Sequence, residues 1–214
     1  MVIPNMTPTK NLRIAIQKNG RLRYPSLDYI VSLGLVFNPE DMDKQMVVGC
    51  LNSEIELLFV RNSDIPEYVK SGVADFGIVG ENVLYERGDN LPIVKKLGFG
   101  KCDLIIASPE KSNIKSVADL NDERIATSYP NSLRKFLSEN GVRASMIVIN
   151  GSVEIATSLN LADAVCDITQ TGNTLRCYNL IPFATILKSE AVLIESPFKS
   201  KNKELFLEKV FKKL

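Results

Sequence analysis

Residues 56–79 read ELLFVRNSDIPEYVKSGVADFGIV, and this stretch decides the fold class. The apolar run Glu56–Val60 predicts a buried strand, and Ser63–Lys70 has the spacing of apolar side chains that is typical of a helix. Gly72 stands where a glycine commonly closes a helix, and Phe76–Val79 predicts a second strand. A strand, a helix and another strand in this order indicate an α/β protein.

The same alternation continues on both sides of this stretch. Further strands are predicted at Leu12–Ile16, Asp103–Ala107, Arg124–Thr127, Met146–Ile149, Ala164–Asp167 and Ala191–Glu195. Further helices are predicted at Ser26–Leu33, Glu81–Glu86, Asn131–Asn140, Val153–Ser158 and Lys203–Lys213. This order predicts a largely parallel sheet. So many strands form either one wide sheet or two sheets, and we favour two lobes, made of residues 1–100 with 188–214 and of residues 101–187.

Composition describes an ordinary globular protein and excludes several classes. The 214 residues are 45% hydrophobic and 24% charged, which rules out a disordered, collagen-like or coiled-coil chain. The net charge of +1 gives no overall attraction for nucleic acid or anionic lipid. The N-terminal stretch MVIPNMTPTKN lacks the apolar core of a signal peptide, and no apolar run is long enough to span a membrane. We therefore expect a soluble, cytoplasmic protein.

The chain contains no histidine, which excludes Ser-His-Asp and Cys-His catalytic pairs and every metal site that needs imidazole. The four cysteines, at positions 50, 102, 166 and 177, lack the close pairing of zinc or redox motifs. They are expected to be free thiols with a structural role.

A loop after the predicted strand Ala164–Asp167 is the strongest candidate for chemistry. Asp167 is followed by Thr171-Gly172-Asn173-Thr174 and then by a helical stretch. Such a turn directs backbone N–H groups and threonine hydroxyls towards one point, as a phosphate monoester requires. The spacing D-x-x-x-T-G-x-T is the one that binders of phosphoribosyl diphosphate use, with the aspartate on the ribose hydroxyls. The alternative interpretation is an ordinary capped turn.

Cations follow two other predicted strands. Lys18 and Arg21 flank the tight turn Asn19-Gly20, and Arg61 follows the strand Glu56–Val60. Cations in such places suit a polyphosphate, which arginine can bind through two hydrogen bonds. The alternative is that all three are ordinary surface cations. Gly77 and Gly80 bracket the end of the next strand, where they serve either close packing or the approach of a flat base.

Taken together, four stretches resemble ATP phosphoribosyltransferases. They are IAIQKNGRL (14–22), VRNSDIPEYVKSGVADFGIVGENVL (60–84), RIATSYPNSLRKFL (124–137) and NGSVEIATSLNLADAVCDITQTGNTL (150–175). The resemblance implies two α/β lobes like those of type II periplasmic binding proteins, with the active site in the cleft between them. It also implies that N1 of the adenine of ATP attacks C1′ of phosphoribosyl diphosphate and expels pyrophosphate. Mg²⁺ would be carried by the substrate phosphates, without a metal site of the protein.

The resemblance also implies roles for individual residues. The phosphoribosyl diphosphate would be bound by Glu154, Asp167, Thr169, Thr171, Gly172, Asn173 and Thr174. Charge on the pyrophosphate and triphosphate would be stabilised by the catalytic cations Lys18, Arg21 and Arg61. The ATP side of the site would be shaped by Gly20, Gly80 and Glu81.

The family has a long form with a C-terminal histidine-sensing domain and a short form regulated by a partner that resembles histidyl-tRNA synthetase. With 214 residues, the chain is expected to be a short form or a catalytic core without the regulatory domain, and to pair at least as a homodimer. The partner subunit is expected only for a true short form. The alternatives are a two-lobed small-molecule binding protein, a catalytically silent regulatory homologue, and a type I phosphoribosyltransferase that uses another base.

Overall fold

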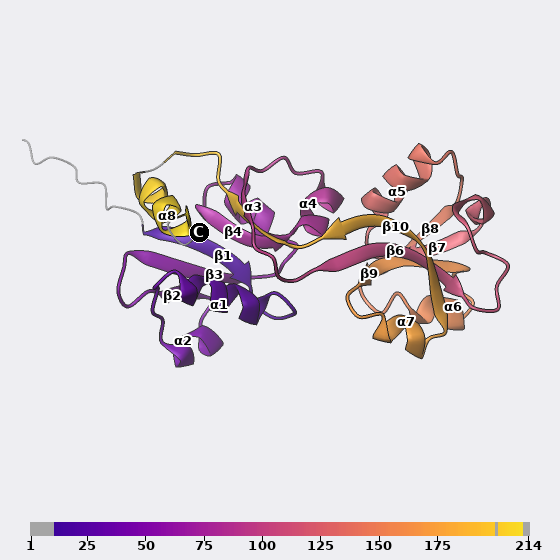
Figure 1. Ribbon diagram of the computed structural model, residues 1–214, viewed down its shortest axis with the longest axis horizontal. Coiled ribbons are helices and arrows are strands. Elements are labelled where there is room, and N and C mark those ends of the chain that lie inside the picture. The colour runs from indigo at the N-terminus through magenta and orange to yellow at the C-terminus, as the bar shows by residue number, and fades with distance from the viewer. Residues whose placement is uncertain (1–10, 200, 212–214) are drawn as a thin grey trace, which may run out of the picture. The chain divides into compact units, whose positions relative to one another are not determined.

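The computed structural model describes residues 11–199 and 201–211 and divides the chain into two compact units (Figure 1). The first unit consists of Met1–Gly80, Asn90–Phe99 and Ala191–Leu214, and the second of Glu81–Asp89 and Gly100–Glu190. The sequence interpretation put residues 81–89, 100 and 188–190 in the first lobe, so this division differs from the expected one mainly at residues 81–89 and slightly at the two junctions.

The physical reason is a set of hydrogen bonds that joins α4 (Glu81–Arg87) to α5 (Pro130–Glu139). The Glu86 carboxylate accepts the backbone N–H groups of Asn131 at 2.9 Å and Ser132 at 2.8 Å, and the Ser132 hydroxyl at 2.7 Å. A carboxylate at the start of a helix also interacts favourably with the helix dipole. These bonds attach α4 to the second unit.

The first unit is built on a six-stranded sheet with the order β2-β3-β1-β4-β11-β5. The strands are β1 (Leu12–Gln17), β2 (Val47–Gly49), β3 (Ile55–Val60), β4 (Phe76–Gly80), β5 (Ile93–Lys96) and β11 (Ala191–Glu195). β1 runs parallel to β3 and β4, as the βαβ pattern predicts, while β2, β5 and β11 pair antiparallel with their neighbours. The carboxyl ends of β1, β3 and β4 therefore meet at one edge of the sheet.

Helices of the first unit are α1 (Arg23–Ser32), α2 (Pro39–Lys44), α3 (Ile65–Lys70) and α8 (Lys201–Phe211). α8 lies beside the sheet of the first unit (Figure 1). The ring centroid of Phe206 on α8 lies 4.8 Å from that of Phe76 on β4. α3 lies so close to β4 that a Cβ on Gly77 would stand 2.6 Å from Cγ2 of Ile65. Of the two roles considered for this glycine, close packing is the one that the structure supports.

The second unit contains a five-stranded sheet with the order β10-β6-β9-β7-β8. The strands are β6 (Cys102–Pro109), β7 (Arg124–Thr127), β8 (Ser145–Val148), β9 (Ala164–Thr169) and β10 (Leu180–Ser189). Besides α4 and α5, the unit has the short helices α6 (Ile155–Ser158) and α7 (Asn173–Cys177) and a 3₁₀ turn at Val117–Leu120. β7 is parallel to β8 and β9, whereas β6 is antiparallel to β9 and β10.

The expectation of largely parallel sheets is thus wrong, because both sheets are mixed. The antiparallel pairs come mainly from three strands that the sequence pattern does not predict, β2, β5 and β10, and from the returning strand β11.

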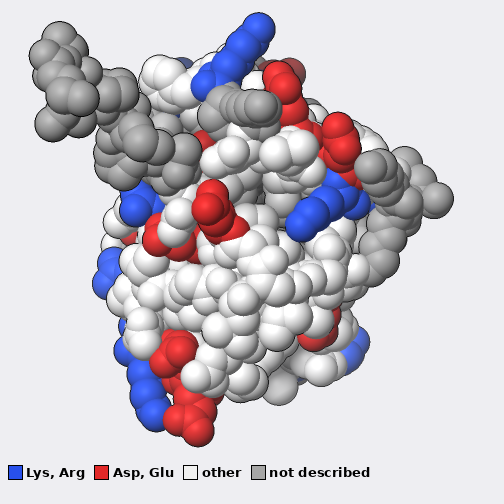
Figure 2. All heavy atoms as spheres, turned by 90° about the vertical axis from the view of Figure 1, so that its left-hand side faces the viewer, with Lys and Arg blue, Asp and Glu red and all other residues white. Residues whose placement is uncertain are grey.

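Neither sign of charge dominates the face of the molecule shown in Figure 2. On the face shown in Figure 2, lysines and arginines are interspersed with aspartates and glutamates, in keeping with the net charge of +1. Within residues 11–199 and 201–211, no helix has the length and apolar character to cross a membrane.

Candidate active site

The loop that follows β1 is held in a tight turn. The N–H of Leu22 donates to Oε1 of Gln17 at 3.0 Å, and the N–H of Arg23 donates to the carbonyl of Gly20 at 3.2 Å. Gly20 has φ +122°, and a Cβ there would lie 2.4 Å from Nε2 of Gln17. Because the Gln17 side chain is already committed to Leu22, only glycine fits this position without strain. The loop presents Lys18 to solvent.

Three of the predicted residues lie at the same edge of the first sheet. The parallel register pairs Gln17 with Val60, so Lys18 and Arg61 are the next residues on neighbouring strands, and the N–H of Lys18 donates to the carbonyl of Val60 at 2.8 Å. Gly80 ends β4, the other parallel neighbour of β1. Lys18 and Arg61 are exposed and Arg21 is half-buried. This edge can therefore offer positive charge to an anionic ligand.

Glu81 forms two hydrogen bonds with the backbone of Glu190. Its N–H donates to the carbonyl of Glu190 at 3.0 Å, and its Oε2 accepts the N–H of Glu190 at 3.2 Å. Both residues belong to the second unit. The structure thus gives the Glu81 carboxylate a structural function, and its contact with ATP stays a prediction.

In the second unit, β9 and the turn before α6 bring two carboxylates together. Asp167 lies on β9 and Glu154 directly precedes α6, and both are half-buried. Burial raises the pKa of Asp167 from 3.8 to about 6, and the negative charge of Glu154 adds to the rise, while a 2.7 Å hydrogen bond from the N–H of Ile168 opposes it. Two mutually repelling carboxylates suit a ligand that donates hydroxyl groups or carries a cation.

The loop from Thr171 to Thr174 has the geometry expected of a phosphate-binding turn. Gly172 adopts the left-handed conformation, φ +72°, and directly precedes α7 without giving the helix a side-chain cap. The N–H groups of the first turn of α7 therefore lack a capping side chain, and the side chains of Thr171, Asn173 and Thr174 are exposed. Because α7 is only 5 residues long, the donors of the loop matter more here than the helix dipole.

Arg176, on α7 directly after this loop, is a residue that the sequence analysis missed. Its Nη2 donates to the carbonyl of Thr171 at 3.3 Å and to the side-chain oxygen of Asn173. The guanidinium thus connects Thr171, at the start of the turn, to Asn173. The signal that could have revealed it is its spacing, since a helical side chain three residues after Asn173 lies on the same face as Asn173.

No group of three or more potential metal ligands lies together among residues 11–199 and 201–211. The four cysteines are all free, as expected. Burial raises the pKa of Cys166 to about 12, so its thiol stays neutral and unreactive near pH 7.

Comparison with known families gives a consistent result. The family model described as ATP phosphoribosyltransferase (HisG) matches residues 61–214. The ATP phosphoribosyltransferase of Cytophaga hutchinsonii is 44% identical over 199 residues, covering 93% of this chain and 69% of the relative. That of Maricaulis maris is 42% identical over 87% of this chain and 65% of the relative. The chain thus spans about two thirds of the length of these curated relatives.

Solved structures include one relative and several proteins that share only the fold. The ATP phosphoribosyl transferase (HisG:HisZ) complex from Thermotoga maritima matches with a TM-score of 0.80 and 29% identity, over 94% of this chain and 97% of that chain. The periplasmic aliphatic sulphonate binding protein SsuA from Escherichia coli matches with a TM-score of 0.62 and 15% identity, over 93% of this chain and 69% of that chain. The α/β fold is therefore that of type II periplasmic binding proteins, as expected, and identity at the level of SsuA supports no conclusion about function.

Proposed function

The chain belongs to the ATP phosphoribosyltransferase family, and from that premise we propose that it transfers the phosphoribosyl group of phosphoribosyl diphosphate to ATP. This is the first step of histidine biosynthesis. The observation that carries the proposal to individual residues is the Thr171–Thr174 loop beside the carboxylate pair of Asp167 and Glu154.

The reaction needs charge stabilisation and alignment more than proton transfer. A bond forms between N1 of the adenine and C1′ of the ribose, while the bond between C1′ and the diphosphate oxygen breaks with its electron pair leaving on pyrophosphate. The N1 lone pair carries no proton, so the attack requires no general base. A chain without histidine can catalyse such a step by orienting two substrates, which contributes up to about 7–11 kcal/mol.

On the donor side, the hydroxyls of Thr171 and Thr174 and the backbone N–H groups around Gly172 and Asn173 hold the 5′-phosphate. Thr169, near the end of β9, contributes to the same side. Asp167, when ionised, accepts hydrogen bonds from the ribose hydroxyls, with Glu154 next to it.

On the leaving-group side, Lys18, Arg21 and Arg61 stabilise the charge that develops on pyrophosphate and the charge of the triphosphate. This role is supported by the position of Lys18 and Arg61, which follow paired strands at one edge of the first sheet. Gly20 and Gly80 allow the nucleotide to approach the backbone at that edge, and Glu81 lies beyond Gly80.

Magnesium fits this site as a companion of the substrate phosphates. The half-buried oxygens of Asp167 and Glu154 are the hard ligands that Mg²⁺ prefers, and their mutual repulsion is relieved by a cation. When bound, Mg²⁺ neutralises charge on the diphosphate. The protein supplies these two carboxylates beside the donor, and the part of the chain that the structure describes holds no cluster of three or more potential metal ligands.

We propose the cytoplasm as the place of this reaction and a homodimer as its smallest assembly. The Thermotoga maritima relative was solved as a HisG:HisZ complex, which supports a regulatory partner subunit for this chain as well. The alternative of a two-lobed binding protein is not favoured, because its support is the shared fold alone.

A direct assay tests the proposal. Purified protein is incubated with ATP, phosphoribosyl diphosphate, Mg²⁺ and pyrophosphatase, and the near-ultraviolet absorbance of N1-substituted adenine is followed. The expected result is an increase that requires both substrates. If no increase occurs with the protein alone or with a regulatory subunit added, the proposed function is wrong.

A further inference from the structure

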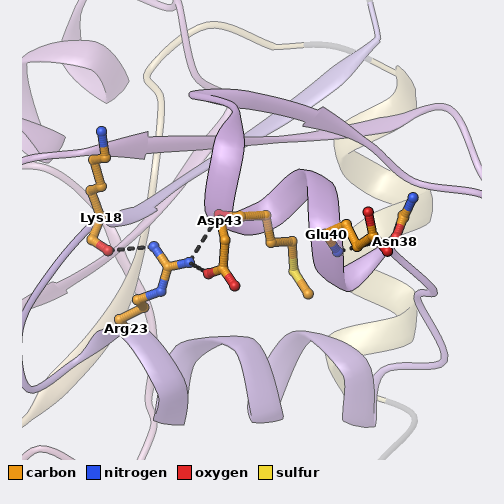
Figure 3. Close-up of polar contacts among 6 residues, drawn as sticks. Lys18, Arg23, Asn38, Glu40 and Asp43 are labelled. Carbon is orange, nitrogen blue, oxygen red and sulfur yellow. Dashed lines mark hydrogen bonds and ion pairs between the residues drawn. The ribbon is translucent and has the colours of Figure 1, made fainter.

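Arg23 is a buried arginine that the reaction scheme above does not use. The residue is 7% exposed and begins α1. It directly follows residues 18–22, the loop after β1 that is called the Lys18 loop below. Its guanidinium donates from Nη1 to the carbonyl of Lys18, and from Nη2 to the carbonyl of Met42 at 2.9 Å and to Oδ1 of Asp43 at 2.8 Å (Figure 3). One side chain therefore connects the Lys18 loop to the end of α2.

Several interactions fix the position of the Arg23 guanidinium. A buried guanidinium is costly unless it is hydrogen-bonded, and here its two terminal nitrogens donate to two carbonyls and a carboxylate. Its carbon Cζ also lies 5.0 Å from the ring centroid of Phe59 on β3, within the range of a cation–π interaction. Arg23 thus joins three segments of the first unit, namely the loop after β1, α2 and β3.

The consequence for Lys18 is that both sides of its backbone are held. Its N–H donates to the carbonyl of Val60 at 2.8 Å, and its carbonyl accepts from Arg23. Figure 3 shows the Lys18 side chain pointing away from Arg23, whereas its carbonyl oxygen faces the guanidinium. Arg23 therefore fixes the base of an exposed lysine without touching the ammonium group.

We propose that Arg23 is a positioning residue, which acts through Lys18 on the departing pyrophosphate. The inference rests on the proposed function, since it assigns Arg23 to the charge stabilisation that Lys18 performs there. Electrostatic catalysis depends on cations that are already in place when the charge develops. A lysine whose peptide group is free to rotate loses that alignment while keeping its charge.

The rival explanation is that Arg23 serves only to hold α2. The chain offers a matched control for it, because α2 is also stabilised at its start by Asn38, whose Oδ1 accepts the N–H of Glu40 at 3.1 Å (Figure 3). Asn38→Ala weakens α2 without altering any partner of Lys18.

The experiment compares the steady-state kinetics of Arg23→Met, Asn38→Ala, Lys18→Met and the double variant Arg23→Met/Lys18→Met, each verified as folded by circular dichroism. Arg23→Met is expected to lower kcat about tenfold with KM values within about twofold of wild type, and Asn38→Ala to leave kcat within about twofold. In the Lys18→Met background, Arg23→Met should lower kcat less than about twofold further, because the two changes remove one interaction.

Equal kcat values for Arg23→Met and Asn38→Ala, or a full tenfold loss in the Lys18→Met background, would overturn the inference while wild-type activity still supports the proposed function. A wild type without activity counts against the proposed function itself. If Arg23→Met does not fold, Arg23→Lys takes its place, because an ammonium group cannot span the same three acceptors. A kcat of Arg23→Lys equal to wild type would then overturn the inference.

Discussion

At the scale of single residues, the raised pKa of Asp167 links its protonation to the stability of the fold. Its pKa is raised to about 6 in the folded chain, from the ordinary 3.8, so the folded state holds its proton more tightly than the unfolded state. As the pH rises from about 4 to about 6, the unfolded state releases its proton first, and the folded state loses stability. Above about pH 6 the loss of folding stability no longer changes with pH.

Asp167→Asn should therefore stabilise the protein while abolishing ribose binding. We expect the free energy of unfolding at pH 7.5 to rise by about 1–2 kcal/mol, with the difference from wild type disappearing below about pH 4. Urea unfolding at several pH values measures this. A variant that is less stable than wild type at pH 7.5 would show that burial of the ionised Asp167 carboxylate does not destabilise the free protein.

The exposed hydroxyls of Thr171 and Thr174 give a second prediction at this scale. Replacing both by valine removes two donors, each contributing about 0.5–1.5 kcal/mol, so the KM for phosphoribosyl diphosphate should rise about tenfold or more. The urea midpoint and the KM for ATP should stay near their wild-type values. An unchanged KM for the donor would rule out these hydroxyls as phosphate ligands.

Gly20 gives a third prediction at this scale. Its positive φ and the nearby side chain of Gln17 both exclude a side chain at this position. Gly20→Ala should destabilise the fold by about 1–3 kcal/mol and lower kcat, since it displaces the turn beside Lys18. Gly49→Ala is the matched control, as an added Cβ there meets no atom within 4 Å. Thermal unfolding compares the two, and equal midpoints would contradict a strained turn at Gly20.

The positions of some residues of the candidate site could be predicted from the sequence. Lys18 and Arg61 were recognised because each follows a predicted strand, and parallel strands end at one edge of a sheet. Arg23 and Arg176 could not be recognised in this way. They act through backbone carbonyls of residues in turns, and the direction of those carbonyls depends on loop geometry that periodicity does not describe.

At the scale of elements, the junction of α4 and α5 gives the clearest prediction. Glu86→Ala removes the carboxylate that accepts three donors at the start of α5, so the free energy of unfolding should fall by about 1–2 kcal/mol. Glu40→Ala removes only an exposed ion pair with Lys44 and should cost less than about 0.5 kcal/mol. Chemical denaturation measures both, and equal losses would show that Glu86 does not cap α5.

Most of the strands that the sequence predicted are buried and rich in apolar residues, although β8 was predicted too and is no more buried than β5. The missed strands β2 and β5 are short edge strands whose sequences carry little alternation. β10 was missed because it contains Pro182 and two irregularities in its register, which interrupt the two-residue pattern. Since these strands pair antiparallel, missing them made the sheets look more parallel than they are.

At the scale of the whole molecule, the fold and the family are separate conclusions. The fold is shared with periplasmic binding proteins at 15% identity, so it leaves the function open. Family membership rests on sequence identity of 42–44% with curated relatives. The sequence predicted both, but its division into lobes differs from the observed units chiefly at residues 81–89, because the hydrogen bonds of Glu86 join segments 45 residues or more apart.

The most direct test of the central claim follows the bond that the reaction makes. The protein is mixed with ATP, Mg²⁺ and phosphoribosyl diphosphate labelled with ¹³C at C1′, and the labelled carbon is observed by NMR. We predict that its resonance moves to that of a carbon bonded to adenine N1, with one pyrophosphate released for each bond formed. An unchanged donor resonance, or release of pyrophosphate with only free ribose 5-phosphate as the labelled product, would contradict phosphoribosyl transfer to ATP.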